Sequence, residues 1–198
     1  MKKTDIHLHL TFEQHPKTEH MFVSSAEHML PHLRELSIEK GILMSSGEGN
    51  SAVPFGSNDE CRQIAEAFPG IYFWMCNLDD VPENIFERLE TYKNQGAVGI
   101  GELMINRSID DPMIQEIFAA AETLSLPVLF HMSPEVGYEY GIVDDAGLPL
   151  LEESLKKYPN LKFIGHSQPF WHEISGDASG DLSSRMEWGK GEVAPGGR

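Results

Sequence analysis

The sequence predicts an α/β protein whose parallel strands curve into a (β/α) barrel, with about six strand–helix units in the chain. Short apolar runs alternate with amphipathic helical segments, which is the pattern of βα units. The expected strands begin about 32 residues apart, close to the length of one such unit. Runs such as 128–130 are continuously apolar, as in strands buried on both faces. Polar residues at the strand ends favour a barrel over a doubly wound open sheet.

The first expected strand covers residues 4–10, where polar and apolar side chains alternate. Residues i, i+2 and i+4 of a strand share one face, so Asp5, His7 and His9 should point together. Two imidazoles and a carboxylate are costly on a buried face unless they have partners. A metal ion would satisfy both histidines. The alternative for so short a motif is a half-exposed edge strand with merely polar histidines.

The later elements follow from apolar spacing, from capping residues and from Pro or Gly at segment ends. We expect further strands at 42–44, 71–76, 97–101, 127–130 and 161–164. We expect helices over about residues 25–39, 58–68, 82–96 and 147–158, and another that begins at Asp111-Pro112.

Residues that bind metals or transfer protons lie at four of these strand ends: His7 and His9, Glu102, His131 and His166. The carboxyl ends of barrel strands converge on one mouth, whereas an open sheet spreads them along a line. No Gly-x-Gly-x-x-Gly follows the first strand, so a dinucleotide-binding sheet has no support. A lone histidine at a strand end is commonly a core residue, and Glu102 could simply cap a turn. The conjunction favours a centre for one or two divalent ions.

Composition narrows the possible partners. The 198 residues include 31 acidic and 15 basic side chains, for a formal net charge of −16, which disfavours nucleic acid. Cys61 and Cys76 form no disulfide framework and are interpreted as reduced cytosolic thiols. No secretory h-region and no apolar run near the ~18 residues of a membrane span is visible. We therefore expect a cytoplasmic protein that acts on a small molecule and could form a homo-oligomer.

With these residues in order, the sequence resembles the amidohydrolase superfamily, in particular its amidohydrolase-related branch, amidohydrolase family 2. The resemblance covers nearly the whole chain and rests on four motifs: Asp5-Ile6-His7-Leu8-His9, Gly101-Glu102, Phe130-His131 and Gly165-His166-Ser167. It implies a (β/α)8 TIM-type barrel with one or two divalent ions, usually zinc, that activate water. It also implies that His7, His9 and His131 are metal ligands and that Glu102 is a bridging ligand. His166 would bind a second ion or polarise the substrate.

The function expected from this resemblance is metal-assisted hydrolysis of a small amide, ester or lactone. A non-oxidative decarboxylase of a small carboxylic acid is the competing enzyme class, and an inactive metal-binding fragment is the third possibility. Phe170 and Trp171 closely follow His166 and are candidates for the wall of the substrate pocket. Packing against a neighbouring loop or subunit is the alternative for both.

The sequence also departs from the family pattern. The family completes its metal set with an aspartate after an eighth strand, and that aspartate also serves as general base. About six units account for this chain, whereas such barrels typically need about 250 residues. We therefore expect residues 1–198 to be one partial barrel domain with an irregular tail over 175–198. A truncated barrel of this kind should be poorly soluble or oligomeric and nearly inactive.

Overall fold

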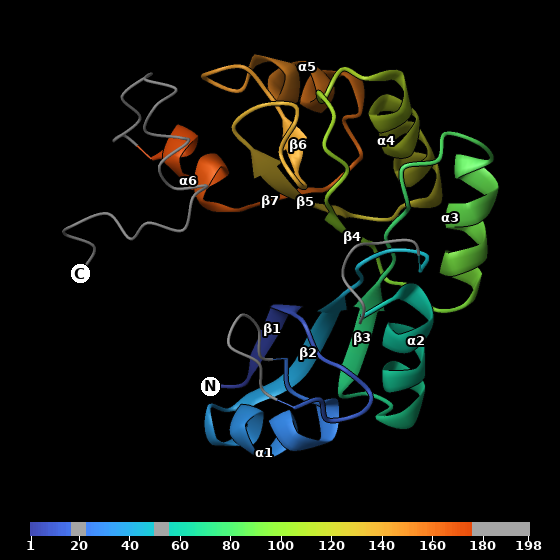
Figure 1. Ribbon diagram of the computed structural model, residues 1–198, viewed down its shortest axis with the longest axis vertical. Coiled ribbons are helices and arrows are strands. Elements are labelled where there is room, and N and C mark those ends of the chain that lie inside the picture. The colour runs from blue at the N-terminus through green and yellow to red at the C-terminus, as the bar shows by residue number, and fades with distance from the viewer. Residues whose placement is uncertain (17–22, 50–55, 176–198) are drawn as a thin grey trace. The chain divides into compact units, whose positions relative to one another are not determined.

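Strands and helices alternate in the computed structural model, which describes residues 1–16, 23–49 and 56–175 (Figure 1). The strands are β1 (Lys3–Leu8), β2 (Ile38–Met44), β3 (Tyr72–Met75), β4 (Ile100–Leu103), β5 (Val128–Ser133), β6 (Ile142–Val143) and β7 (Phe163–His166). The helices are α1 (Ala26–Glu35), α2 (Asn58–Ala67), α3 (Ile85–Asn94), α4 (Pro112–Leu124), α5 (Pro149–Lys157) and α6 (Gln168–Ile174). The predicted tail covers residues 175–198, of which 176–198 lie outside the described residues.

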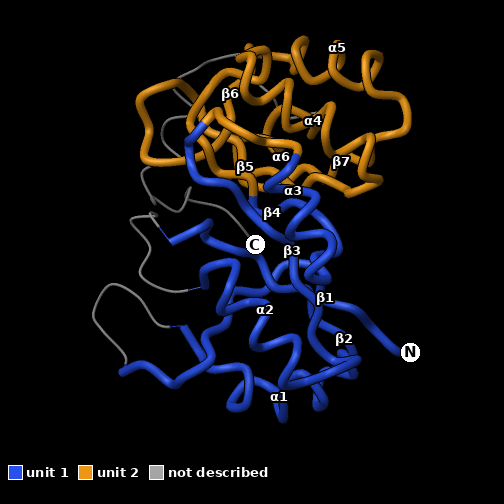
Figure 2. The backbone as a smooth tube through the Cα atoms, turned by 90° about the vertical axis from the view of Figure 1, so that its right-hand side faces the viewer, with its two compact units in different colours: residues 1–81, 87–102 blue, residues 82–86, 103–198 orange. Residues whose placement is uncertain are grey.

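The chain forms two compact units, shown in two colours in Figure 2. Unit 1 comprises residues 1–81 and 87–102, and unit 2 comprises residues 82–86 and 103–198. The boundary falls inside β4, between Glu102 and Leu103. Each unit contains parallel strands and the helices that connect them, as expected for βα units.

Unit 1 is built on a parallel sheet of order β1-β2-β3. The register of β2 and β3 runs from Gly41 opposite Tyr72 to Met44 opposite Met75. Two N-capping serines begin the flanking helices, because the side chain of Ser25 accepts a backbone N–H of α1 and that of Ser57 accepts one of α2. The strands bury the large side chains of Leu43, Met44, Tyr72 and Trp74, and α2 buries Ile64.

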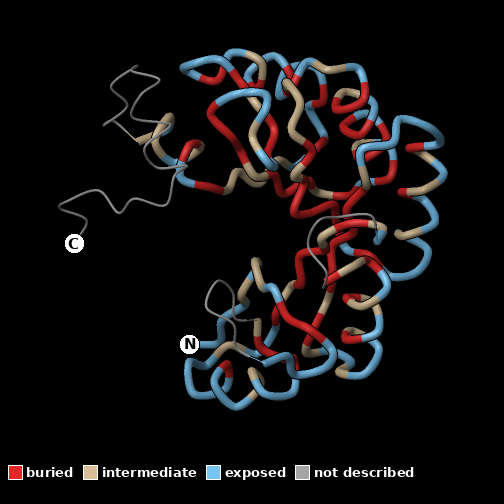
Figure 3. The backbone as a smooth tube through the Cα atoms, in the orientation of Figure 1, coloured by how far each residue is buried: buried red, intermediate tan, exposed pale blue. Residues whose placement is uncertain are grey.

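Unit 2 is built on β5, which pairs in parallel with both β7 and β6. Helix α4 begins where Asp111 accepts the N–H of Met113, with proline at the first turn. It buries Ile114, Ile117, Phe118 and Ala121, whose spacing of three and four residues puts them on one face of the helix. Figure 3 shows burial along the backbone, and β3, β4 and β5 are almost wholly buried whereas β1 and β7 are partly exposed.

Two features of the fold differ from the sequence prediction. The first helix ends at Glu35 and not near residue 39, because Ser37 adopts a left-handed φ of 60° and Ile38 already pairs with Lys3. The two-residue strand β6 and the short helix α6 were not predicted, since both lie in segments expected to be loops. Among the described residues, no helix is long and apolar enough to cross a membrane.

Candidate functional site

His7 and His9 lie together as predicted, although the strand that was expected to carry both ends at Leu8. His7 is half-buried on β1 and His9 is exposed just beyond it. Their Nε2 atoms are 3.0 Å apart, with ring centroids 4.9 Å apart. Asp5 accepts the backbone N–H of His7 at 3.0 Å, so its carboxylate stabilises the chain where the histidines project.

Glu102 adds a carboxylate to this pair. Its residue is only 4% exposed, and its Oε2 lies 3.5 Å from the Nε2 of both His7 and His9. The preceding residue, Gly101, is held on both sides of β4. Its C=O accepts the N–H of Ser45 at 3.0 Å, and its N–H donates to the C=O of Cys76 at 2.8 Å. The glutamate is therefore presented by backbone that is bonded to the ends of both β2 and β3.

The three donor atoms fit a divalent ion. Two donors bound to one ion at about 2.0–2.2 Å lie roughly 3.0–3.5 Å apart. The separations among His7, His9 and Glu102 span that range. A nitrogen and oxygen set of this kind suits zinc or manganese. Burial raises the pKa of Cys61 and Cys76 to about 12, so neither thiol is a ready thiolate ligand.

Unit 2 brings the other two predicted histidines together. His131 on β5 and His166 on β7 are partners in the parallel register, and their ring centroids are 5.5 Å apart. The hydroxyl of Ser167 donates to the C=O of Met132 at 3.0 Å and accepts its N–H at 3.1 Å. This reciprocal bond secures the chain next to both histidines, so their proximity follows from local register.

The sequence model of the amidohydrolase family matches residues 4–190. The chain belongs to the amidohydrolase family. No curated protein shows a significant match to it.

Solved structures with the same fold include enzymes of two reaction types. The 2,6-dihydroxybenzoate decarboxylase from Rhizobium is 15% identical, with a TM-score of 0.60 over 86% of this chain and 69% of that protein. The manganese-bound 5-carboxyvanillate decarboxylase from Novosphingobium aromaticivorans is 15% identical, with a TM-score of 0.57 over 86% and 68%. A putative 2-pyrone-4,6-dicarboxylic acid hydrolase from Pseudomonas putida is 14% identical, with a TM-score of 0.53 over 82% of this chain and 55% of that protein.

These likenesses establish the fold as that of the TIM-barrel amidohydrolases, of which this chain contains a partial barrel. The predicted fold class is thereby confirmed.

The two aromatic candidates for the substrate pocket lie on α6. The Phe170 ring packs edge-on against Phe130 at 5.6 Å. A Cβ at Gly165 would lie 2.2 Å from the Phe170 ring, so this glycine allows the ring to contact β7. Trp171 is 59% exposed, and its ring lies 5.7 Å from that of Phe170. Substrate binding by either residue stays a prediction.

Asn106, which holds the loop of Tyr140 near His131, was missed by sequence reasoning. Tyr140 lies against His131, with ring centroids 4.7 Å apart. Asn106 binds the loop on both sides of Tyr140. Its Nδ2 donates to Gly141 O at 2.8 Å, and its Oδ1 accepts the Gly137 N–H at 2.6 Å. An asparagine in a loop carries no periodic signal, so the sequence offers little to single it out.

Proposed function

We propose that this amidohydrolase binds a divalent ion through His7, His9 and Glu102 and hydrolyses a small amide, ester or lactone. The observation that carries the proposal is the set of donor separations, 3.0, 3.5 and 3.5 Å, within unit 1. A solvated surface cluster would not require a carboxylate that is 4% exposed beside two imidazoles. An ion would compensate that buried charge.

Each residue has a separate task in this proposal. Neutral His7 and His9 donate nitrogen lone pairs, and Glu102 supplies negative charge and an oxygen donor. A divalent ion held there would lower the pKa of bound water to about 7 and so supply a nucleophile at neutral pH. His131 is proposed as a further metal ligand. His166 is proposed either to bind a second ion or to polarise the substrate carbonyl and transfer a proton to or from the substrate.

Zinc is the metal that we propose, because two imidazoles and a carboxylate form a common zinc set in hydrolytic sites. Manganese is the comparison metal, since the related decarboxylase from Novosphingobium aromaticivorans holds it. Phe170 and Trp171 are proposed to contribute apolar surface to the substrate pocket.

Non-oxidative decarboxylation is the second candidate, supported by the two decarboxylases among the structures of the same fold. In that case the ion would hold a substrate carboxylate, and His166 would protonate the carbon that loses carbon dioxide. The same metal ligands would serve either reaction, so the residues of unit 1 do not distinguish hydrolysis from decarboxylation.

The test compares the metal-free chain with chain reconstituted with zinc or manganese. One panel holds small esters, lactones and amides, and a second holds aromatic carboxylic acids assayed for carbon dioxide release. Hydrolysis that requires the metal supports the proposal, whereas metal-dependent carbon dioxide release alone supports the second candidate. Bound metal without turnover in either panel would contradict both enzymatic assignments.

A further inference from the structure

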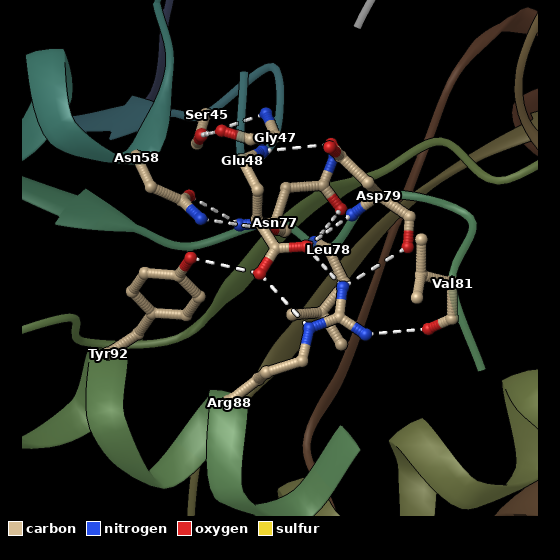
Figure 4. Close-up of polar contacts among 10 residues, drawn as sticks. All are labelled: Ser45, Gly47, Glu48, Asn58, Asn77, Leu78, Asp79, Val81, Arg88 and Tyr92. Carbon is tan, nitrogen blue, oxygen red and sulfur yellow. Dashed lines mark hydrogen bonds and ion pairs between the residues drawn. The ribbon is translucent and has the colours of Figure 1, made fainter. Parts of the chain in front are cut away.

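A second cluster of polar side chains in unit 1 surrounds Glu48, in the loop that follows β2 (Figure 4). Its carboxylate accepts Arg88 Nε at 3.0 Å and the Tyr92 hydroxyl at 2.9 Å, while Arg88 Nη2 contacts the other oxygen. The side chains of Glu48 and Arg88 are each only 18% exposed. The Glu48 cluster, defined as Glu48, Asp79, Arg88 and Tyr92, therefore joins a loop to helix α3 through charged hydrogen bonds.

The cluster also locks two loops to each other. The N–H of Glu48 donates to Asp79 Oδ1 at 2.9 Å, and the N–H of Asp79 donates to Glu48 Oε2 at 3.0 Å. Gly47 makes this approach possible, since it has a φ of 126° and a Cβ there would lie 2.4 Å from Asp79 Oδ1. Arg88 Nη1 donates to Val81 O at 2.6 Å and so fixes the end of the second loop.

Both locked loops begin at residues that hold the chain of Glu102. Ser45, at the start of the Glu48 loop, donates its N–H to Gly101 O at 3.0 Å. Cys76, at the start of the Asp79 loop, accepts the N–H of Gly101 at 2.8 Å. Gly101 is thus hydrogen-bonded to the first residue of each loop, and Glu102 is the next residue. Displacement of either loop would move the backbone that aims the Glu102 carboxylate at the two histidines.

We propose that the Glu48 cluster positions Glu102 for metal binding, acting through Ser45, Cys76 and the backbone of Gly101. This inference rests on the proposed role of Glu102 as a ligand. A buried ion pair contributes little net stability compared with apolar residues of the same size, so a purely structural role explains the cluster poorly. A small displacement of a ligand weakens metal binding, so a cluster that holds the Glu102 carboxylate in place would strengthen it.

The protonation states of the cluster suit a fixed lock. Burial raises the pKa of Tyr92 to about 12, so its hydroxyl remains a donor at neutral pH. The hydrogen bond to Glu48 raises the pKa of Arg88 above its usual value, so the guanidinium stays charged. Tyr92 and Arg88 therefore both remain hydrogen-bond donors to Glu48 at neutral pH.

The test is a titration of the metal-free chain with Co²⁺, read by the visible spectrum of the bound ion and by its dissociation constant. Tyr92→Phe and Tyr72→Phe form a matched pair, because each removes one hydroxyl hydrogen bond from unit 1. The Tyr72 hydroxyl donates to Ala26 O at 2.9 Å, outside the Glu48 cluster, and burial raises its pKa to about 12 as well.

Substitution within the cluster should weaken cobalt binding. Glu48→Gln should do so by about tenfold and Tyr92→Phe by a few-fold, at the low end of outer-shell effects on metal sites. Both should change the cobalt spectrum, which reports ligand geometry. Tyr72→Phe should lower thermal stability yet retain the wild-type affinity and spectrum.

Two results would overturn the positioning role while leaving the proposed function intact. One is unchanged cobalt affinity and spectrum in both Glu48→Gln and Tyr92→Phe. The other is an equal loss in Tyr72→Phe, which would show that general destabilisation is the cause. A wild-type chain that binds no cobalt would overturn the proposed function, and this inference with it.

Discussion

The two units present their histidines in different ways. In unit 1, His7 lies on β1 and His9 just beyond its end, and a buried carboxylate lies 3.5 Å from both. In unit 2, His131 and His166 come from two neighbouring strands, with an aromatic ring beside the first. Unit 1 therefore supplies three donors and a negative charge, which suffices for an ion, whereas unit 2 supplies a pair of imidazoles. The comparison predicts that metal affinity depends mainly on unit 1.

The largest expected effect is the loss of both unit 1 histidines, His7 and His9. Outer-shell substitutions alone cost about 10–100-fold in metal affinity, so removing two direct ligands should cost more than about 100-fold. The double variant His7→Ala, His9→Ala should therefore lose its metal entirely when protein from zinc-supplemented medium is measured by elemental analysis. Unchanged metal content would refute the assignment of unit 1 as the metal centre.

A smaller loss of metal affinity is expected for Glu102 substitution, and a still smaller one for substitution of a unit 2 histidine. Glu102→Gln keeps the shape of the side chain but removes its charge, so metal affinity should fall by about 10–100-fold while far-ultraviolet circular dichroism stays unchanged. His131→Ala should lower the affinity less, because the three donors of unit 1 remain. If Glu102 merely caps a turn, its substitution will leave the metal occupancy as it was. A greater loss in His131→Ala would reverse the comparison between the units.

The framework of both units was accessible from the sequence because its signals are local. Alternation over residues 4–10 placed His7 and His9 on one face, and the spacing of Ile114, Ile117 and Phe118 identified the buried face of α4. Glu102 and His131 were readable for the same reason, since each follows a short strand-like run, although β4 and β5 extend past them.

What the sequence could not reveal depends on contacts between distant residues. Glu48 and Arg88 are 40 residues apart, and nothing in either segment signals that they form an ion pair. The early end of α1 depends on the backbone conformation of Ser37, a residue type with no strong preference for the left-handed region. Helix α6 is short and directly follows a strand, so its seven residues show too little periodicity to be told from a loop.

The smallest expected effect concerns the two neighbouring aromatic residues on α6. Phe170 packs against Phe130 and over Gly165, so Phe170→Ala should destabilise the fold by about 2–3 kcal/mol, below the cost at a fully buried site. Trp171 is 59% exposed, and Trp171→Ala should change the free energy of unfolding by no more than about 0.5 kcal/mol. Thermal unfolding of the two variants measures this contrast.

Because Trp171→Ala should leave the fold intact, its kinetics report directly on substrate contact. If the indole forms part of the pocket wall, it contributes to substrate and transition state alike, so KM should rise several-fold while kcat stays near the wild-type value. Phe170→Ala would change both constants through the altered packing of β5 and β7. Unchanged KM and kcat in Trp171→Ala would remove Trp171 from the substrate pocket and leave Phe170 as a packing residue of unit 2.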